Sequence, residues 1–304
     1  MGKETYKVSL EHVFAANRQK LLTELRSICP CGVVFLKGGT NPERFDTDHE
    51  PIFRQESYFW WLSGVKEPDC ALALDIASGK TTLFIPFLDA DYATIMGPIK
   101  TPEQWKEHYQ VDEVLYLEDI ERILESSLSK GSTINGSTAN GHSSEPLASK
   151  LLLMRGLNTD SGNMYEAPAN ILKTKSKVIK SKIDTTTLFP ILCECRVMKS
   201  DAELAIMRHI SEVTSFGHAY VMRNIKPGRM EYQGESLFSH YCYYNYGARL
   251  MSYTSICCSG INGAILHYGH AGEPNNRQLQ EEDMCLFDMG AEYQGNYLFF
   301  GSSK

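Results

Sequence analysis

The 304-residue sequence lacks both a long apolar run and an excess of basic charge. No stretch approaches the ~20 apolar residues that a membrane-spanning helix needs. The opening "MGKETYKVSLEHVFAANRQKL" also has no apolar core or small-residue cleavage site typical of a signal peptide. Asp and Glu (37) outnumber Lys and Arg (30), which gives a net charge of -7. A basic footprint for nucleic acid or an anionic membrane is absent, and we expect neither as a partner.

The cysteines lack the spacing of a metal or redox motif. There are nine, an odd number, and none forms a CxxC pair. Cys257 and Cys258 have no thiol-protease signature around them. The tight pairs are too close for the usual zinc-finger spacing: Cys29/Cys31, Cys193/Cys195 and Cys257/Cys258. We therefore expect reduced, mostly buried thiols in a cytoplasmic protein.

The first part of the chain alternates strand-like and helix-like segments. Apolar residues at helical spacing predict a helix over 9–28, and "CGVVFLKGG" predicts a buried strand that ends at a turn. Residues 57–86 favour a strand, a Ser-Gly-Lys turn and a second strand, which is a hairpin. Thr101 followed by proline predicts a helix start, and 111–128 predicts a strand followed by a helix. This mixture indicates an α/β domain.

A polar stretch and a basic stretch separate this part from the rest. Residues 126–146 are rich in Ser, Gly, Asn and Thr without periodicity, which predicts a flexible surface insertion. The basic stretch around Pro190 indicates a connection, so we place the domain boundary between 1–190 and 191–304.

The second part predicts two helices followed by strands. Ser200 and Glu203 form a capping-box pattern that opens one helix, and Gly247 ends the other. Three strand-like runs follow: "SYTSICCSG", "NGAILHYG" and "MCLFDMGAEY". Helices followed by a meander of strands indicate an α+β domain.

Asp288 in "CLFDMG" is the sharpest local feature. A carboxylate at the end of an apolar strand is costly to bury unless it is paired or binds a metal. The same tetrapeptide could equally be a turn in which the aspartate caps a local amide. In "HYGHAG", His267 and His270 are expected just past a strand. Residues three apart on a strand face opposite sides, so the two histidines are not expected to bind one metal together. Each would therefore act singly, or be a satisfied polar side chain.

Several longer segments resemble one family. They include "FRQESYFWWLSGVKEPDCALALDIASGKTTLFIP", "RGLNTDSG", "ECRVMKSDAELAIMRH", "MSYTSICCSG" and "LHYGHAGEPNNRQLQEEDMCLFDMGAEY". In order and over nearly the whole chain to Tyr293, they are similar to prolidase, the Xaa-Pro dipeptidase of the metallopeptidase family that includes aminopeptidase P and methionine aminopeptidase.

The resemblance implies a fold and a chemistry. The fold is an α/β N-terminal domain of the creatinase type (1–190) plus an incomplete α+β pita-bread domain (191–304). Family members hold two manganese ions on two Asp, one His and two Glu, hydrolyse Xaa-Pro dipeptides, and are usually homodimers. Two metals ~3.5–4 Å apart can activate a bridging water, and hard carboxylates suit Mn²⁺.

The resemblance also assigns residues. Asp288 matches the first metal-binding Asp, and His267 and Tyr253 match positions that line the substrate pocket. The second metal-binding Asp is expected at position 299, where this chain has Phe299. Glu292 is not a convincing substitute, because a residue four further along a strand lies ~13 Å away. The family's His and two Glu lie in a C-terminal region that this sequence does not contain, so no catalytic set is complete.

The sequence therefore leaves two hypotheses. The first is a prolidase-like manganese metallopeptidase. The second is a C-terminally truncated, non-catalytic isoform that acts as a dimerisation partner of the full-length enzyme, because a lone carboxylate cannot hold a metal pair. We expect the chain by itself to be inactive.

Overall fold

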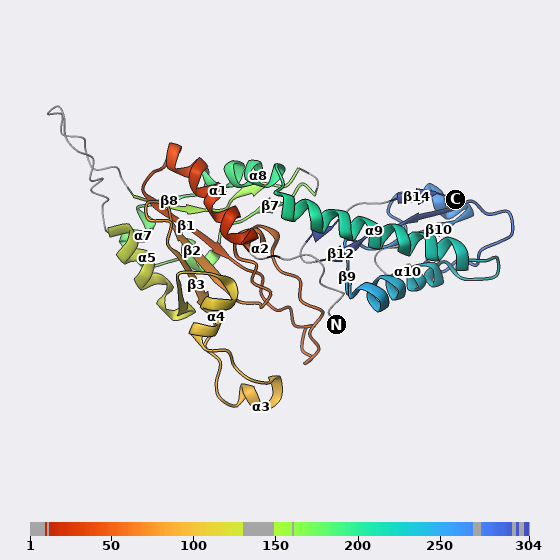
Figure 1. The fold of residues 1–304 in the computed structure, drawn as a ribbon, viewed down its shortest axis with the longest axis horizontal. Coiled ribbons are helices and arrows are strands. Elements are labelled where there is room, and N and C mark those ends of the chain that lie inside the picture. Colours follow the sequence, from red (N-terminus) through yellow and green to blue (C-terminus); the bar gives the residue numbers. More distant parts are fainter. Residues whose placement is uncertain are drawn as a thin grey trace. The chain divides into compact units, whose positions relative to one another are not determined.

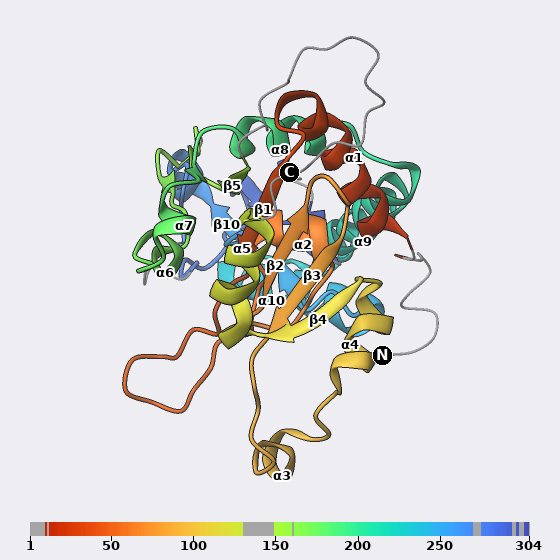
Figure 2. The ribbon, with the colours of Figure 1, turned by 90° about the vertical axis from the view of Figure 1, so that its left-hand side faces the viewer.

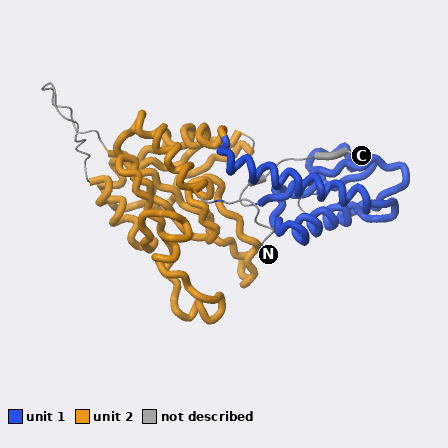
Figure 3. The backbone as a smooth tube through the Cα atoms, viewed as in Figure 1, with its two compact units in different colours: residues 1–10, 199–304 blue, residues 11–198 orange. Residues whose placement is uncertain are grey.

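The computed structural model describes residues 10, 12–129, 149–159, 161–269, 275–293, 296–297 and 301–303. Its contacts divide the chain into two compact units, Glu11–Met198 and Lys199–Lys304, the latter together with the first ten residues (Figure 3). The division falls after the helix α8 (Leu188–Val197), whereas the sequence placed a boundary inside this helix, at 190/191. The reason is packing, since Leu192 and Cys195 of α8 belong to the same apolar core as the first helix.

The unit Glu11–Met198 alternates helices and strands around a mixed sheet (Figure 1). In chain order its elements are α1 (Val13–Ile28), β1 (Gly32–Lys37), α2 (Ser57–Ser63), β2 (Ala71–Asp75), β3 (Thr81–Ile85), α3 (Tyr92–Met96), α4 (Pro102–Tyr109), β4 (Glu113–Tyr116), η2 (Leu117–Asp119), α5 (Ile120–Ser129), β5 (Lys150–Leu153), β6 (Gly156–Leu157), β7 (Met164–Tyr165), α6 (Ala169–Leu172), α7 (Lys177–Lys180), β8 (Ile183–Asp184) and α8.

The sheet has the strand order β4-β3-β2-β1-β5-β8. The pairs β1–β2 and β2–β3 are antiparallel, and β3–β4, β1–β5 and β5–β8 are parallel. The expected hairpin is confirmed as β2–β3. Its turn is held by the Asp75 carboxylate, which accepts hydrogen bonds from the backbone N–H of Ser78 (2.8 Å) and from its hydroxyl (2.6 Å).

Helices cover both faces of this sheet, because the strands are apolar on both sides. Successive residues of β1 alternate between two cores: Val34 and Leu36 face α1, α2 and α8, while Val33 and Phe35 face α5. Figure 2 shows α5 lying across the face of the sheet that is turned to the viewer. The α/β class expected from the sequence is confirmed.

Two expectations for this unit need correction: the strand expected at 57–63 and the start of the polar insertion expected at 126–146. Ser57–Ser63 is the helix α2 and not part of a strand, because the Glu56 carboxylate caps its first N–H groups and Gly64 ends it with φ +70°. The expected polar insertion begins too early, since its first four residues are the end of α5. Residues 130–146 of the expected insertion lie outside the described residues.

In the unit Lys199–Lys304, two helices pack against each other and are accompanied by short strands. Its elements are α9 (Asp201–Asn224), α10 (Glu231–Tyr246), β9 (Leu250–Met251), β10 (Ile256–Ser259), η3 (Gly260–Ala264), β11 (Cys285–Asp288), β12 (Ala291–Tyr293), β13 (Asn296–Tyr297) and β14 (Gly301–Ser303). One sheet has the order β10-β11-β14 and another has the order β13-β12-β9. The Ser200–Glu203 capping box is confirmed, with both of its hydrogen bonds present.

Two of the three expected strand runs of this unit need correction. "NGAILHYG" is not a strand: its start belongs to the 3₁₀ helix η3, and 266–269 form a turn. Gly260 has φ +53°, a left-handed conformation that interrupts an extended chain. "MCLFDMGAEY" is not one strand but two, since β11 and β12 belong to different sheets and Met289 and Gly290 between them are in neither strand.

All nine cysteines lie in the described part of the chain, where each is a free thiol and seven are buried. Among the helices of the described residues, none is both long enough and apolar enough to cross a membrane.

Candidate functional site

Asp288 is the last residue of β11, as the sequence predicted. It lies opposite Ile256 of β10 in the antiparallel ladder and is half-buried. The hydroxyl of Tyr253 donates a hydrogen bond to its Oδ1. The two residues are 35 positions apart in the sequence, so the carboxylate is held by a phenol from another part of the chain. The structure therefore brings together two of the three residues that the resemblance assigned to the site.

The backbone just after Asp288 is anchored by polar side chains of α9. Nε2 of His218 lies 2.9 Å from the carbonyl oxygen of Met289, and the Thr214 hydroxyl accepts a hydrogen bond of 3.4 Å from the N–H of Ala291. Both α9 side chains are buried, and they lie four residues apart on one helical face. Polar residues at this spacing on an otherwise apolar face are a signal that the sequence analysis did not use.

Ser252 also anchors the backbone that follows Asp288. Its N–H donates to the carbonyl of Gly290 (2.8 Å) and its hydroxyl donates to that of Ala291 (2.9 Å). Because Ser252 directly precedes Tyr253, the same hydrogen bonds also place the phenol beside Asp288. The backbone that follows the carboxylate is thus held by side chains from α9 and by Ser252.

His267 is placed on a different segment, in the turn that follows η3, and its side chain is exposed. The expectation that it follows a strand is wrong for the reason given above. His270 lies outside the described residues.

A fully buried carboxylate that the sequence analysis missed holds this His267 segment. Glu231, the first residue of α10, has no exposed surface. Its Oε1 accepts hydrogen bonds from the N–H (2.6 Å) and the hydroxyl (2.8 Å) of Ser259. Its Oε2 accepts from the Tyr268 hydroxyl (2.6 Å) and from the N–H of Arg277 (3.1 Å). Asn262 Nδ2 donates to both oxygens, at 3.2 and 3.3 Å.

The donors around Glu231 are themselves tied together. Burial and the hydrogen bond to Glu231 raise the pKa of Tyr268 to about 12, so this phenol remains a donor at neutral pH. The Arg277 guanidinium donates to the Ser259 hydroxyl (2.7 Å) and forms an ion pair with Asp283. The hydrogen bond to Asp283 raises the pKa of Arg277, so its charge is secure. The network joins 259–262, 268 and 277 to the N-terminus of α10.

The described residues do not fit a binuclear metal centre by themselves. Within the described ranges, no three His, Cys, Asp or Glu side chains form a group that could hold a metal ion. Glu292 lies on β12, which belongs to a different sheet from the β11 strand that ends at Asp288. Phe299, at the expected second position, lies outside the described residues. Asp288 is therefore a single candidate carboxylate.

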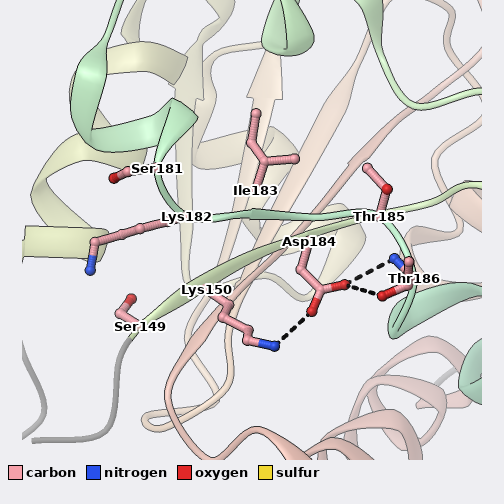
Figure 4. Close-up of a pocket in the computed structure, with 8 residues that line it drawn as sticks. All are labelled: Ser149, Lys150, Ser181, Lys182, Ile183, Asp184, Thr185 and Thr186. Carbon is pink, nitrogen blue, oxygen red and sulfur yellow. Dashed lines mark hydrogen bonds and ion pairs between the residues drawn. The ribbon is translucent and has the colours of Figure 1, made fainter.

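The other unit contains a cavity of about 560 Å³ at the sheet edge formed by β8 (Figure 4). Two of its lining residues form an ion pair, with Lys150 Nζ 2.9 Å from Asp184 Oδ2. The lining is Ser149, Lys150, Ser181, Lys182, Ile183, Asp184, Thr185 and Thr186. None of the site residues expected from the sequence belongs to this lining.

Comparison with known proteins identifies both units. The family model of the aminopeptidase P N-terminal domain matches residues 14–135, and that of metallopeptidase family M24 matches residues 205–299. The Xaa-Pro dipeptidases of Homo sapiens and Rattus norvegicus are each 44% identical to this chain over 296 residues, which cover 96% of it and 55% of each relative. This chain thus spans about half the length of these curated relatives.

Solved structures share the fold. The zinc-substituted aminopeptidase P of E. coli, in complex with product, superposes with a TM-score of 0.75 and 24% identity, over 98% of this chain and 62% of that one. Proline aminopeptidase P II from Yersinia pestis gives a TM-score of 0.75 and 25% identity, over 97% of this chain and 63% of that one. The expected creatinase-type domain followed by a domain of the pita-bread class is confirmed, and together they match 62% of the E. coli chain.

Proposed function

The chain belongs to the Xaa-Pro dipeptidase group of metallopeptidase family M24, and from this premise we propose that it contributes to the hydrolysis of Xaa-Pro dipeptides. The observation that carries the proposal is 44% identity to named Xaa-Pro dipeptidases over 296 residues. Identity at this level runs through both units, whereas fold alone would not specify a chemistry.

Within this function, we assign Asp288 as a metal ligand and Tyr253 and His267 as residues of the substrate pocket. The hydrogen bond from the Tyr253 hydroxyl to Asp288 supports placing the first two at one site. It orients the carboxylate, which is the role that outer-shell partners of metal ligands commonly have. Manganese is the ion that we propose, because hard carboxylate oxygens suit Mn²⁺.

The 304 residues alone supply only part of this centre in our proposal. Asp288 is a single carboxylate, and the described residues hold no group of three ligands. We therefore expect a polypeptide of these residues to be inactive by itself. The alternative function that we propose for it is that of a non-catalytic dimerisation partner of a longer chain. Exposed Ile95 and Met96 on α3 (85% and 60% exposed) support self-association as a homodimer. The free cysteines support a reducing, cytoplasmic location.

A chimera tests the enzymatic proposal. Residues 1–293 would be followed by the remaining C-terminal part of human Xaa-Pro dipeptidase, and release of proline from Gly-Pro would be measured with Mn²⁺. We expect chelator-sensitive hydrolysis. Asp288→Asn should lower it by at least the roughly 100-fold that loss of an outer-shell partner can cause.

Glu282→Gln is the matched control for this chimera. It removes one exposed negative charge just before β11 and should leave the rate unchanged. Full activity of the Asp288→Asn chimera would contradict the assignment of Asp288. A folded chimera without any activity toward Gly-Pro would contradict the proposed substrate.

A further inference from the structure

We propose that Glu231 is a positioning residue that fixes the His267 turn for substrate binding; the inference rests on the proposed function. Glu231 is remote in sequence from the residues it holds, by 28 positions from Ser259 and 37 from Tyr268. Nothing in the resemblance assigned it a role.

The geometry supports this role because Glu231 contacts the segment on both sides of η3. Ser259, at the end of β10, donates to one carboxylate oxygen, and Tyr268, next to His267, donates to the other. Asn262, inside η3, donates to both oxygens and also to the Tyr268 hydroxyl at 2.9 Å. One carboxylate therefore closes the segment 259–268 into a loop with fixed ends.

Among the described residues, this turn buries few apolar side chains, and the network supports it. Ile261, Ile265 and Leu266 are 82%, 53% and 81% exposed. Tyr268, which directly follows His267, is buried, and its hydroxyl donates a hydrogen bond to Glu231. A segment with few buried apolar contacts opens easily unless hydrogen bonds hold it. The bond from Tyr268 to Glu231 therefore helps to hold the backbone beside His267.

The position of Glu231 also suits a carboxylate. It is the first residue of α10, where the partial positive charge of the helix N-terminus favours an anion. A buried carboxylate that is fully hydrogen-bonded is stable, but a neutral amide of the same shape accepts fewer bonds and brings two N–H donors toward other donors. Glu231→Gln therefore keeps the volume and removes the function that we assign.

Hydrogen exchange of the 304-residue protein tests the proposal. In Glu231→Gln, amide exchange in 260–269 should rise about 10–100-fold, the factor that follows from losing a buried hydrogen bond to a charged group. Exchange in the middle of α9 should stay within about threefold. Glu235→Gln is the matched control, since this residue lies one turn along the same helix and accepts a hydrogen bond from Asn275 (2.7 Å). It should leave 260–269 unchanged.

A spectroscopic measurement separates positioning from general stability. The ring resonances of His267 and His218 would be assigned with His267→Gln and His218→Gln, then compared between variants. Glu231→Gln should shift the His267 resonance toward its unfolded value and leave that of buried His218 in place. If both resonances move together, or if neither moves, Glu231 is not a positioning residue.

A second variant covers the case in which Glu231→Gln does not fold. Tyr268→Phe removes one hydroxyl and keeps the ring, and it should shift His267 in the same direction. An unchanged His267 resonance in this variant would overturn the proposal.

Titration with Gly-Pro then tests the connection to substrate. The dipeptide should shift the His267 resonance in the unmodified protein and do so at higher concentration in Tyr268→Phe. If Gly-Pro leaves His267 unmoved, the assignment of His267 to the substrate pocket is wrong. The exchange result still decides the role of Glu231 separately.

Discussion

In the unit Glu11–Met198 a mixed sheet buries apolar side chains on both faces, whereas in Lys199–Lys304 short strands share one core with α9 and α10. The two units also differ in how they hold a carboxylate. Asp184 of the first unit pairs with Lys150 at the surface. Glu231 of the second is fully buried among neutral donors, two of which are backbone N–H groups. The first unit is organised by apolar packing, and the second depends on buried polar contacts to place its site residues.

The largest effect is expected in the sheet core. Leu74 of β2 is fully buried, and Leu74→Ala should lower the free energy of unfolding by about 2–5 kcal/mol because it leaves a cavity. Leu157→Ala, at a position 52% exposed, should change it by less than about 0.5 kcal/mol. Urea unfolding of both variants measures this. An equal loss of unfolding free energy in the two variants would contradict the account of apolar packing.

The contact between α9 and α10 comes next. A Cβ at Gly217 would lie 2.8 Å from Phe238 Cε2 and 2.9 Å from Cys242 Sγ. Gly217→Ala should therefore lower the free energy of unfolding by about 1–3 kcal/mol, despite the better helix propensity of alanine. Gly263→Ala is the control, since a Cβ there meets no described atom within 4 Å. A stabilised Gly217→Ala protein in thermal unfolding would show that the helices do not depend on this close approach.

The site of the second unit should respond to a single hydroxyl. Tyr253→Phe removes the donor to Asp288 and should cost about 1–2 kcal/mol in urea unfolding, the range for a hydrogen bond to a charged group that is half-buried. Tyr244→Phe, with a side chain 78% exposed, should be neutral. If both substitutions are neutral, the phenol does not hold the carboxylate in solution.

The surface pair of the first unit should give the smallest effect, visible through pH. Burial raises the pKa of Asp184, but hydrogen bonds from Lys150, Thr186 and Thr187 outweigh burial and hold this pKa well below its usual value. A depressed carboxyl pKa stabilises the fold above the unfolded pKa of about 3.9, and this contribution is lost as the pH falls below about 4.

Asp184→Asn removes that dependence. The free energy of unfolding should fall by roughly 1 kcal/mol at pH 7, because Lys150 is half-exposed, and should vary less between pH 5 and pH 2. Asp46→Asn, at an exposed position, should keep the dependence of the unmodified protein. An Asp184→Asn protein that loses as much stability in acid as the unmodified one would contradict this assignment.

The sequence predicted the elements whose signals are local. The capping box at Ser200 and Glu203 marks the start of α9, and a short apolar run followed by two glycines marks β1. It failed for Ser57–Ser63, where aromatic residues favour a strand but the local caps form a helix. It also failed for "NGAILHYG", whose turn is stabilised by a carboxylate more than 25 residues away.

The candidate site was predictable only in part, and for the same reason. Asp288 was found because it ends an apolar strand, and the resemblance named Tyr253 near it. Glu231, Thr214 and His218 were missed, since their partners are 28, 77 and 71 residues away in sequence. No spacing rule connects side chains at such distances, so the fold itself has to supply them.

The count of bound manganese tests most directly our central proposal, that the described residues contribute one carboxylate, Asp288, to a metal centre and do not complete a pair. Equilibrium dialysis of the 304-residue protein against micromolar Mn²⁺, followed by elemental analysis, gives the number of ions per chain. The account predicts a value well below one. A value of two, reduced by Asp288→Asn, would contradict it.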